Sequence, residues 1–108
     1  MTFHIRAMGM EPTPAIQSYV EEKLTGLEKF YDGIIHIEVD LGKDTNHHNK
    51  GDIFTCIAMV QVPGDMLRVE KTEEDLYKAI DKVRDHLREM LVERKERMRE
   101  ERRQVEGE

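Results

Sequence analysis

Apolar and polar residues alternate in four segments of the chain, which is the pattern of strands that are buried on one face. The second segment, I-I-H-I-E-V-D-L, follows Gly33, and the third runs from Ile53 to Val62. The turn V-P-G-D joins the third segment to the fourth, which predicts a hairpin. The expected inward positions are Phe3, Ile5 and Ala7, then Ile35, Ile37, Val39 and Leu41, then Phe54, Cys56, Ala58, Val60 and Val62, and finally Leu67 and Val69.

Two further segments repeat their apolar residues every three or four positions, as one face of an α-helix does. The first is expected to begin with Thr13 as N-cap and Pro14 as first helical residue, and to end near Asp32-Gly33. The second is expected to begin with Thr72 as N-cap and to continue to about residue 102. Their apolar stripes are Ile16, Val20, Leu24, Leu27 and Tyr31 in the first helix, and Leu76, Ala79, Ile80, Val83, Leu87, Met90 and Leu91 in the second.

The order of these elements predicts an α+β fold, a two-layer sandwich with the order β-α-β-β-β-α. A right-handed crossover makes the first two strands parallel, and both helices then cover one face of a four-stranded sheet. Burial should fade near residue 92, so residues 1–93 form the domain and residues 94–108 a charged helical extension or a disordered tail. The uncovered face of the sheet is expected to carry His4, Arg6, His36, Glu38, Asp40, Gln61 and Arg68.

Length and composition fit this single thin domain. The chain has 108 residues, of which 38% are hydrophobic, and its formal net charge is -6. Cys56 is the one cysteine, so no intramolecular disulfide is expected and a reducing compartment is favoured. The amino terminus has no leader pattern and no segment reaches the ~20 apolar residues that span a bilayer. We therefore expect a soluble, cytoplasmic protein without a membrane partner.

Charge is unevenly distributed along the chain. Residues 1–70 hold 6 basic and 11 acidic groups, whereas residues 71–108 hold 11 and 12. A helical wheel of the second helix gathers its cations beside the apolar stripe and its carboxylates on the other side. The basic flank comprises Arg84, Arg88, Lys95, Arg99 and Arg102, and the acidic flank comprises Asp85, Glu89, Glu93, Glu96 and Glu100. Guanidinium groups at four- and seven-residue spacing can bind successive phosphates of an RNA backbone.

Other interpretations of the same helix remain open at this stage. Pairs such as Glu93 with Arg97 can simply stabilise a solvated helix by roughly 0.2–0.5 kcal/mol each. The charge-segregated helix can also serve a protein-interaction module that binds an acidic or coiled-coil partner, although Met98 and Val105 are sparse for a coiled-coil seam. On the first helix, Lys23 lies at the edge of the apolar stripe, where it either contacts a phosphate or extends its ammonium into solvent.

Chemistry other than RNA binding has weaker support. His47 and His48, with Asp44 and Asp52 nearby, suggest a metal site, but adjacent histidines in a loop lack the helical spacing that preorganises ligands. The sequence has no glycine-rich phosphate loop, no paired zinc cysteines and no nucleophile elbow. We therefore expect no enzymatic activity, no cofactor and no small-molecule substrate.

The segment E-D-L-Y-K-A-I-D-K-V-R-D-H-L, which follows P-G-D-M-L-R-V-E, resembles the hibernation-promoting factor family, also called ribosome-associated inhibitors or sigma-54 modulation proteins. P-T-P-A-I and V-E-E-K-L-T-G-L-E-K-F are similar to the first helix of that family. The resemblance implies the fold derived above and a translation inhibitor that occupies the mRNA and tRNA path of the small ribosomal subunit, against its rRNA. It also implies ribosome hibernation in stress and stationary phase, and a short form without the dimerisation domain of longer members.

The resemblance also implies which residues bind rRNA, because family members use basic residues of both helices. Lys23, Lys29 and Lys95 match positions where the family commonly has cations. His86, Glu89 and Glu93 replace cations of the family pattern, and neighbouring arginines supply positive charge instead. The full candidate RNA-binding set is Lys23, Lys29, Lys82, Arg84, Arg88, Arg94, Lys95 and Arg99.

Overall fold

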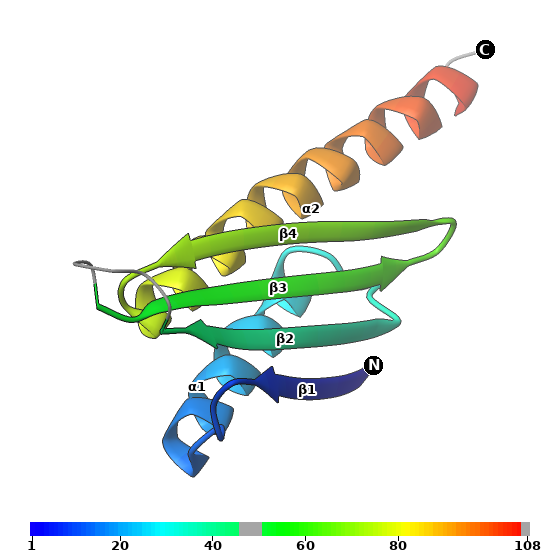
Figure 1. Cartoon of the computed structure of the whole chain (residues 1–108). Helices are drawn as coiled ribbons and strands as arrows, with labels where there is room; N and C mark the ends of the chain where they lie inside the picture. Colours follow the sequence, from blue (N-terminus) through cyan, green and yellow to red (C-terminus); the bar gives the residue numbers. More distant parts are fainter. Residues whose placement is uncertain (46–50, 107–108) are drawn as a thin grey trace.

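The computed structural model describes residues 1–45 and 51–106 and consists of one sheet with two helices on the same side (Figure 1). The elements are β1 (Thr2–Met8), α1 (Pro14–Thr25), the 3-10 turn η1 (Gly26–Lys29), β2 (His36–Asp44), β3 (Ile53–Val62), β4 (Asp65–Glu73) and α2 (Leu76–Glu106). The strand order is β1-β2-β3-β4, with β1 parallel to β2 and the other pairs antiparallel. The predicted two-layer α+β sandwich is confirmed.

Strand register explains why the core is continuous. Phe3 lies opposite Ile37, Ile37 opposite Val60, and Val60 opposite Leu67, so inward side chains form a row across the sheet. The apolar stripe of α2 packs on β3 and β4, and α1 packs on β1 and α2. Apolar side chains that alternate along strands therefore meet apolar side chains that repeat along helices, and the hydrophobic effect holds the two layers together.

The first helix is shorter than the sequence pattern predicts. Thr13 is its N-cap, as expected, and the Thr13 hydroxyl accepts a hydrogen bond from the Ile16 amide at 3.2 Å. The α-helix ends at Thr25 instead of near Asp32, and the chain continues as a 3-10 turn from Gly26. Glycine disfavours a helix interior, and the tighter turn still buries Leu27. The apolar periodicity therefore persists beyond the end of the helix.

The second strand differs from its prediction at both ends. Ile35 was expected in the core, but it precedes the strand and is 46% exposed, and Ile34 is buried in its place. At the other end, β2 includes Gly42, Lys43 and Asp44, which the turn-rich sequence assigned to a loop. These residues extend the strand because they pair with Ile53–Thr55 of β3. His47 and His48 lie outside the described residues.

The start of α2 also differs from its prediction. Thr72, expected as the N-cap, belongs to β4, and its hydroxyl lies 3.2 Å from that of Thr55 on the neighbouring strand. Asp75 caps the helix instead, because its carboxylate accepts a hydrogen bond from the Tyr77 amide at 2.9 Å. Pairing with β3 thus extends β4 through Thr72 and Glu73, where the sequence alone predicts the start of the helix.

The carboxyl-terminal half of α2 extends beyond the sheet (Figure 1). Leu91 is the last buried side chain of the helix among the described residues, which confirms that burial fades near residue 92. With 31 residues, α2 is about 46 Å long at 1.5 Å per residue. Residues 94–106 are therefore a helical extension whose described side chains, through residue 104, are not fully buried.

Candidate nucleic-acid interface

The basic flank of α2 lies along the side of the helix that faces α1 and η1. The guanidinium of Arg88 lies over the ring of Phe30, 5.8 Å from its centroid. One helical turn before Arg84, Asp81 accepts a hydrogen bond from Tyr19 of α1. The seam between α1 and α2 is therefore bordered by cations of α2. Among the described residues of α1, Lys23 is the one cation at this seam.

Lys23 has a defined position in a small polar cluster. Its ammonium lies 4.0 Å from a carboxylate oxygen of Asp81 and 5.4 Å from the centroid of the Tyr19 ring. Tyr19 donates a hydrogen bond of 2.5 Å to the same oxygen of Asp81, and this bond raises the pKa of Tyr19 to about 12. The Tyr19 and Tyr77 rings pack edge to face, with centroids 4.8 Å apart. Asp81 thus fixes a lysine and a tyrosine at the seam.

Arg84 is less available than the other cations of the basic flank. Its side chain is 28% exposed, and its Nε lies 3.0 Å from a carboxylate oxygen of Asp85. That approach lacks hydrogen-bond geometry, so the buried Nε–H has no partner within the described residues. Because Arg84 is partly covered, its role at the seam is to add positive electrostatic potential. It does not serve as an exposed binding group.

Lys95, Arg99 and Arg102 continue the basic flank on the projecting half of α2. All three are exposed, and none forms an ion pair in the part of the chain that the structure describes. They line one side of a groove that also contains Tyr31, Pro63 and Met98, with Asp32 and Gly33 completing it. Arg99 also lines a second crevice together with Glu96, Glu100 and Arg103, around the helix from Lys95. Lys95 and Arg102 are therefore set apart from the carboxylates, as the helical wheel predicts, whereas Arg99 lies at the border between the two flanks.

Two cations of the predicted set are engaged by the fold. Lys82 pairs with Glu73 of β4 and lies beside Asp85 and Glu89 on the acidic flank. Arg94 donates to the Pro63 carbonyl at 2.8 Å, to Asp65 at 3.2 Å and to the Tyr31 hydroxyl at 3.4 Å, and its side chain is only 18% exposed.

Arg94 therefore anchors α2 to the turn between β3 and β4, a role that the sequence reasoning missed. The available signal was its position, because Arg94 follows Leu87 by seven residues and Leu91 by three, and so continues the apolar stripe. A cation in that stripe must find hydrogen-bond partners within the protein. Lys29 differs, since it is exposed at the end of η1 and has no ion-pair partner among the described residues.

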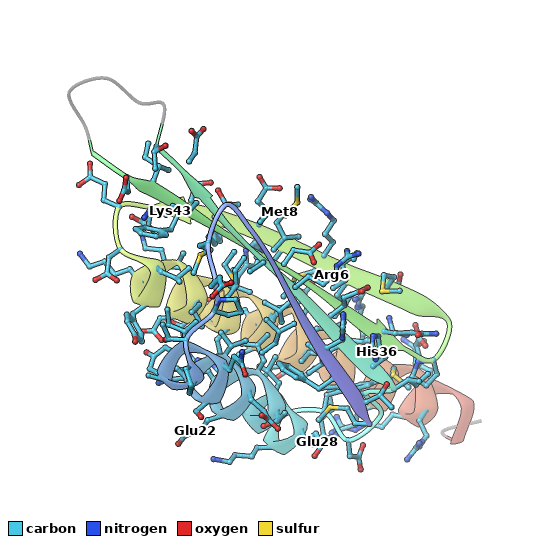
Figure 2. The ribbon with its side chains drawn as sticks, turned by 60° about the horizontal axis from the view of Figure 1, so that its bottom comes forward. Arg6, Met8, Glu22, Glu28, His36 and Lys43 are labelled. Carbon is cyan, nitrogen blue, oxygen red and sulfur yellow. The ribbon has the colours of Figure 1, made fainter. Side chains whose placement is uncertain are left out.

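The uncovered face of the sheet forms a second surface. Figure 2 shows Arg6, Met8 and His36 on the side of the sheet away from the helices. Arg6 donates two hydrogen bonds to Asp40, at 2.9 and 3.1 Å, and this pairing raises the pKa of Arg6. A hollow of about 660 Å³ lies beside them, and it is lined mostly by apolar atoms of β1, β2 and β3. Arg6 and Arg68, the two arginines expected on this face, are thus already paired, since Arg68 contacts Glu70 at 2.9 Å.

Other predicted features form no site within the described residues. The proposed metal ligands His47 and His48 lie outside the described residues, and Asp52 pairs with Lys43 at 3.4 Å. Within residues 1–45 and 51–106, no group of three metal-ligating side chains comes together. Cys56 is buried in the core, and burial raises the pKa of its thiol to about 12. None of the described helices is long and apolar enough to cross a membrane.

Comparison with known families identifies the chain. Residues 3–99 match the family described as sigma 54 modulation protein / S30EA ribosomal protein. The chain belongs to this family. The match includes both helices as far as Arg99, and so it covers the seam and most of the basic flank.

Individual relatives and solved structures agree with this assignment. The chain is 33% identical over 91 residues to ribosome-associated factor Y of Haemophilus influenzae, covering 84% of this chain and 79% of that protein. It is 31% identical over 81 residues to the ribosome hibernation promotion factor of Bacillus subtilis, covering 75% of this chain. The crystal structure of the Thermus thermophilus Protein Y N-terminal domain is 31% identical with a TM-score of 0.75, covering 86% of this chain and 98% of that one.

The longer relatives contain more than this chain. The matched region is 41% of the Bacillus subtilis protein and 46% of the ribosome hibernation promotion factor of Deinococcus radiodurans. A ribosomal subunit interface protein from Coxiella burnetii, 22% identical with a TM-score of 0.76 and covering 88% of this chain and 98% of that one, shares the fold. The S30EA-type fold is therefore shared with proteins of closely similar extent and with one domain of longer ones.

Proposed function

We propose that this chain is a ribosome hibernation factor that binds the small ribosomal subunit and its rRNA in the mRNA and tRNA path and inhibits translation by steric occlusion. The observation that carries the proposal is the basic flank of α2, whose cations Lys95, Arg99 and Arg102 are exposed and form no ion pair within the described residues. Support also comes from the names of the relatives, which are ribosome-associated or ribosome hibernation factors.

Local charge explains how an acidic chain binds a polyanion. A net charge of -6 disfavours contact with RNA over most of the surface. Lys95, Arg99 and Arg102 follow one another at rises of about 6 and 4.5 Å along the helix axis. Each can donate charge-assisted hydrogen bonds to phosphate oxygens and release counterions, so binding is restricted to the face that carries them.

The shape of the molecule fits a protein that blocks a binding site better than one that catalyses a reaction. The body and the projecting helix together measure 61 × 26 × 19 Å, and the body is a packed two-layer sandwich. A rigid body held by phosphate contacts excludes other ligands from the space that it fills. The proposed mechanism therefore needs no catalytic step, cofactor or small-molecule substrate, and it places the protein with ribosomes in the cytoplasm.

The contact residues follow from the exposure of each cation. We assign phosphate contacts to cations that are exposed or held in a defined position. We exclude cations whose charged groups are occupied by hydrogen bonds or ion pairs within the fold. The assigned set is Lys23, Lys29, Arg88, Lys95, Arg99 and Arg102, whereas Arg84, which is partly covered and lies against Asp85, adds positive potential only. Lys82 and Arg94 are assigned to the stability of the fold, because their charged groups already contact Glu73 and the β3–β4 turn respectively.

Co-sedimentation with purified small subunits over a salt series tests the proposal. The triple variant Arg88→Glu, Lys95→Glu, Arg99→Glu should lose binding. The slope of log K against log salt concentration should become shallower by about 3, which is about 1 for each phosphate that the variant no longer binds. The matched control is Lys78→Glu, Arg97→Glu, Arg103→Glu, which makes the same change in net charge at exposed positions outside the basic flank. Equal loss of binding in both triples would contradict the assigned surface.

Two further arms test the mechanism. Small subunits already carrying mRNA and tRNA should bind the protein weakly, and in vitro translation should be inhibited by the native chain but not by the basic-flank triple. Full binding to the occupied subunits would rule out occlusion. Binding that survives ribonuclease digestion of the subunit would instead support the protein-interaction alternative.

A further inference from the structure

We propose that the groove under the projecting half of α2 binds one unpaired nucleotide of an RNA strand, an inference that rests on the function proposed above. The groove has a volume of about 450 Å³, within the range typical of small-ligand sites. It lies where α2 passes the end of the β3–β4 hairpin and the segment that enters β2.

The floor of the groove is closely packed around Tyr31. Tyr31 is 6% exposed, and its hydroxyl donates to the Met98 sulfur at 3.4 Å. Arg94 contacts both the Tyr31 hydroxyl and the Pro63 carbonyl, so it joins α2 to both sides of the floor. A Cβ at Gly33 would lie only 2.7 Å from the Tyr31 ring, which shows how closely the backbone packs there.

One side of the groove is cationic. Lys95, Arg99 and Arg102 line it from successive turns of α2, whereas Asp32 is the one carboxylate in the lining. The three cations are exposed and form no ion pair within the described residues. A ligand that matches this arrangement is a flat apolar group flanked by more than one negative charge.

A nucleotide in a single RNA strand has these properties. Its base can pack on the exposed part of Met98, which is 46% exposed, and on Pro63, while the phosphates on either side contact the cations. A duplex keeps its bases stacked and paired, so it offers the groove only phosphates. The groove is therefore expected to distinguish unpaired RNA from duplex RNA, although the basic flank attracts both.

Fluorescence anisotropy with two RNA probes tests this inference on the whole chain. The probes are an unstructured RNA strand of roughly 12 nucleotides and the same strand annealed to its complement. The native protein should bind the single strand more tightly. Met98→Gln should weaken single-strand binding about fivefold and leave duplex binding unchanged, because it removes base packing but no charge.

Val92→Gln is the matched control, since Val92 is an exposed apolar residue of the same helix that does not line the groove. It should bind both probes as the native chain does. Equal native affinity for the two probes, or equal loss in both glutamine variants, would overturn the proposal. Displacement of the strand by an equimolar nucleoside monophosphate would also overturn it, because the site would then belong to a free nucleotide.

Co-sedimentation of the native chain with small subunits keeps this test separate from that of the proposed function. If the native chain co-sediments but shows no preference for single strands, the groove inference fails and the ribosomal proposal stands. If the native chain prefers single strands but never co-sediments, the ribosomal proposal fails and the groove is a general RNA-binding site.

Discussion

The two halves of α2 have the same secondary structure and opposite surroundings. From Leu76 to Leu91 the helix buries an apolar stripe against β3 and β4, whereas from Val92 onward its described side chains face solvent or the groove, apart from Arg94, which contacts the β3–β4 turn. Charged residues are frequent in both halves, so the density of charge along the helix does not mark this division. What separates the halves is the length of the sheet beneath, since strands of seven to ten residues cannot cover a helix of 31.

This difference implies a division of roles within one helix. The packed half contributes burial of apolar area, which stabilises the fold and fixes the direction of the helix. The projecting half contributes little burial, so its sequence is free to carry charge at regular spacing. Substitutions of buried residues in the first half should therefore change the free energy of unfolding, and substitutions of exposed cations in the second half should change binding to RNA.

The largest expected effect comes from a cavity in the packed half. Leu87→Ala should lower the free energy of unfolding by about 2–5 kcal/mol, because Leu87 is fully buried between α2 and the sheet. Met98→Ala, a similar truncation in the projecting half, should change it by less than about 1 kcal/mol. Denaturant titration monitored by circular dichroism measures both free energies of unfolding. Comparable losses in the two variants would show that the projecting half contributes to stability as much as the packed half does.

Arg94 tests where the boundary between the halves lies. Arg94→Gln should lower the free energy of unfolding by about 1–2 kcal/mol, because it removes the hydrogen bonds to Asp65 and the Pro63 carbonyl. Arg99→Gln, one turn further along, should leave stability within about 0.5 kcal/mol and weaken RNA binding instead. Thermal melts beside RNA-binding measurements separate the two outcomes. A stability loss in Arg99→Gln equal to that in Arg94→Gln would move the boundary toward the carboxyl terminus.

The smallest effect concerns the polar cluster on the packed half. Asp81→Asn should return the pKa of Tyr19 from about 12 toward its ordinary value of about 10, with a stability change below about 1 kcal/mol at neutral pH. A raised pKa favours the neutral phenol in the folded state, so its stabilisation is complete below pH 10 and is lost as pH rises through 12.

Tyrosinate absorbance follows this titration as one of three tyrosine contributions, and the chain has no tryptophan that would absorb in the same range. The matched control is Asp85→Asn, a carboxylate one turn further along α2 that contacts no tyrosine among the described residues. Identical titration curves for the two variants would show that Asp81 does not hold Tyr19 in solution.

Alternation and helical spacing were sufficient for the architecture, because each predicted strand or helix presents one apolar face that only a second layer can bury. Element ends were less predictable. The end of α1 at Gly26 and the cap at Asp75 depend on pairing and packing with distant residues, which local propensity does not include. Ile34 and Ile35 show the same limit, since the exact start of β2 decides which of two adjacent isoleucines is buried.

The candidate site was predictable in its charge pattern but not in its detail. The helical wheel separated Arg88, Lys95 and Arg99 from the carboxylates because helix geometry alone determines which residues share a flank. The roles of Lys82 and Arg94 depend on Glu73 and on the β3–β4 turn, both of which reach α2 only through the tertiary fold. The groove beside Met98 likewise requires three segments that are far apart in the sequence.

The parallel pairing of β1 with β2 has a consequence for the order of assembly. Partners such as Thr2 and His36 are 34 residues apart, whereas β3 and β4 are joined by the short turn at Pro63 and Gly64. Closing a long loop costs more chain entropy than closing a short one, so the hairpin should form early and β1 should dock late. In pulsed hydrogen exchange during refolding, amides of β3 and β4 should gain protection before those of β1.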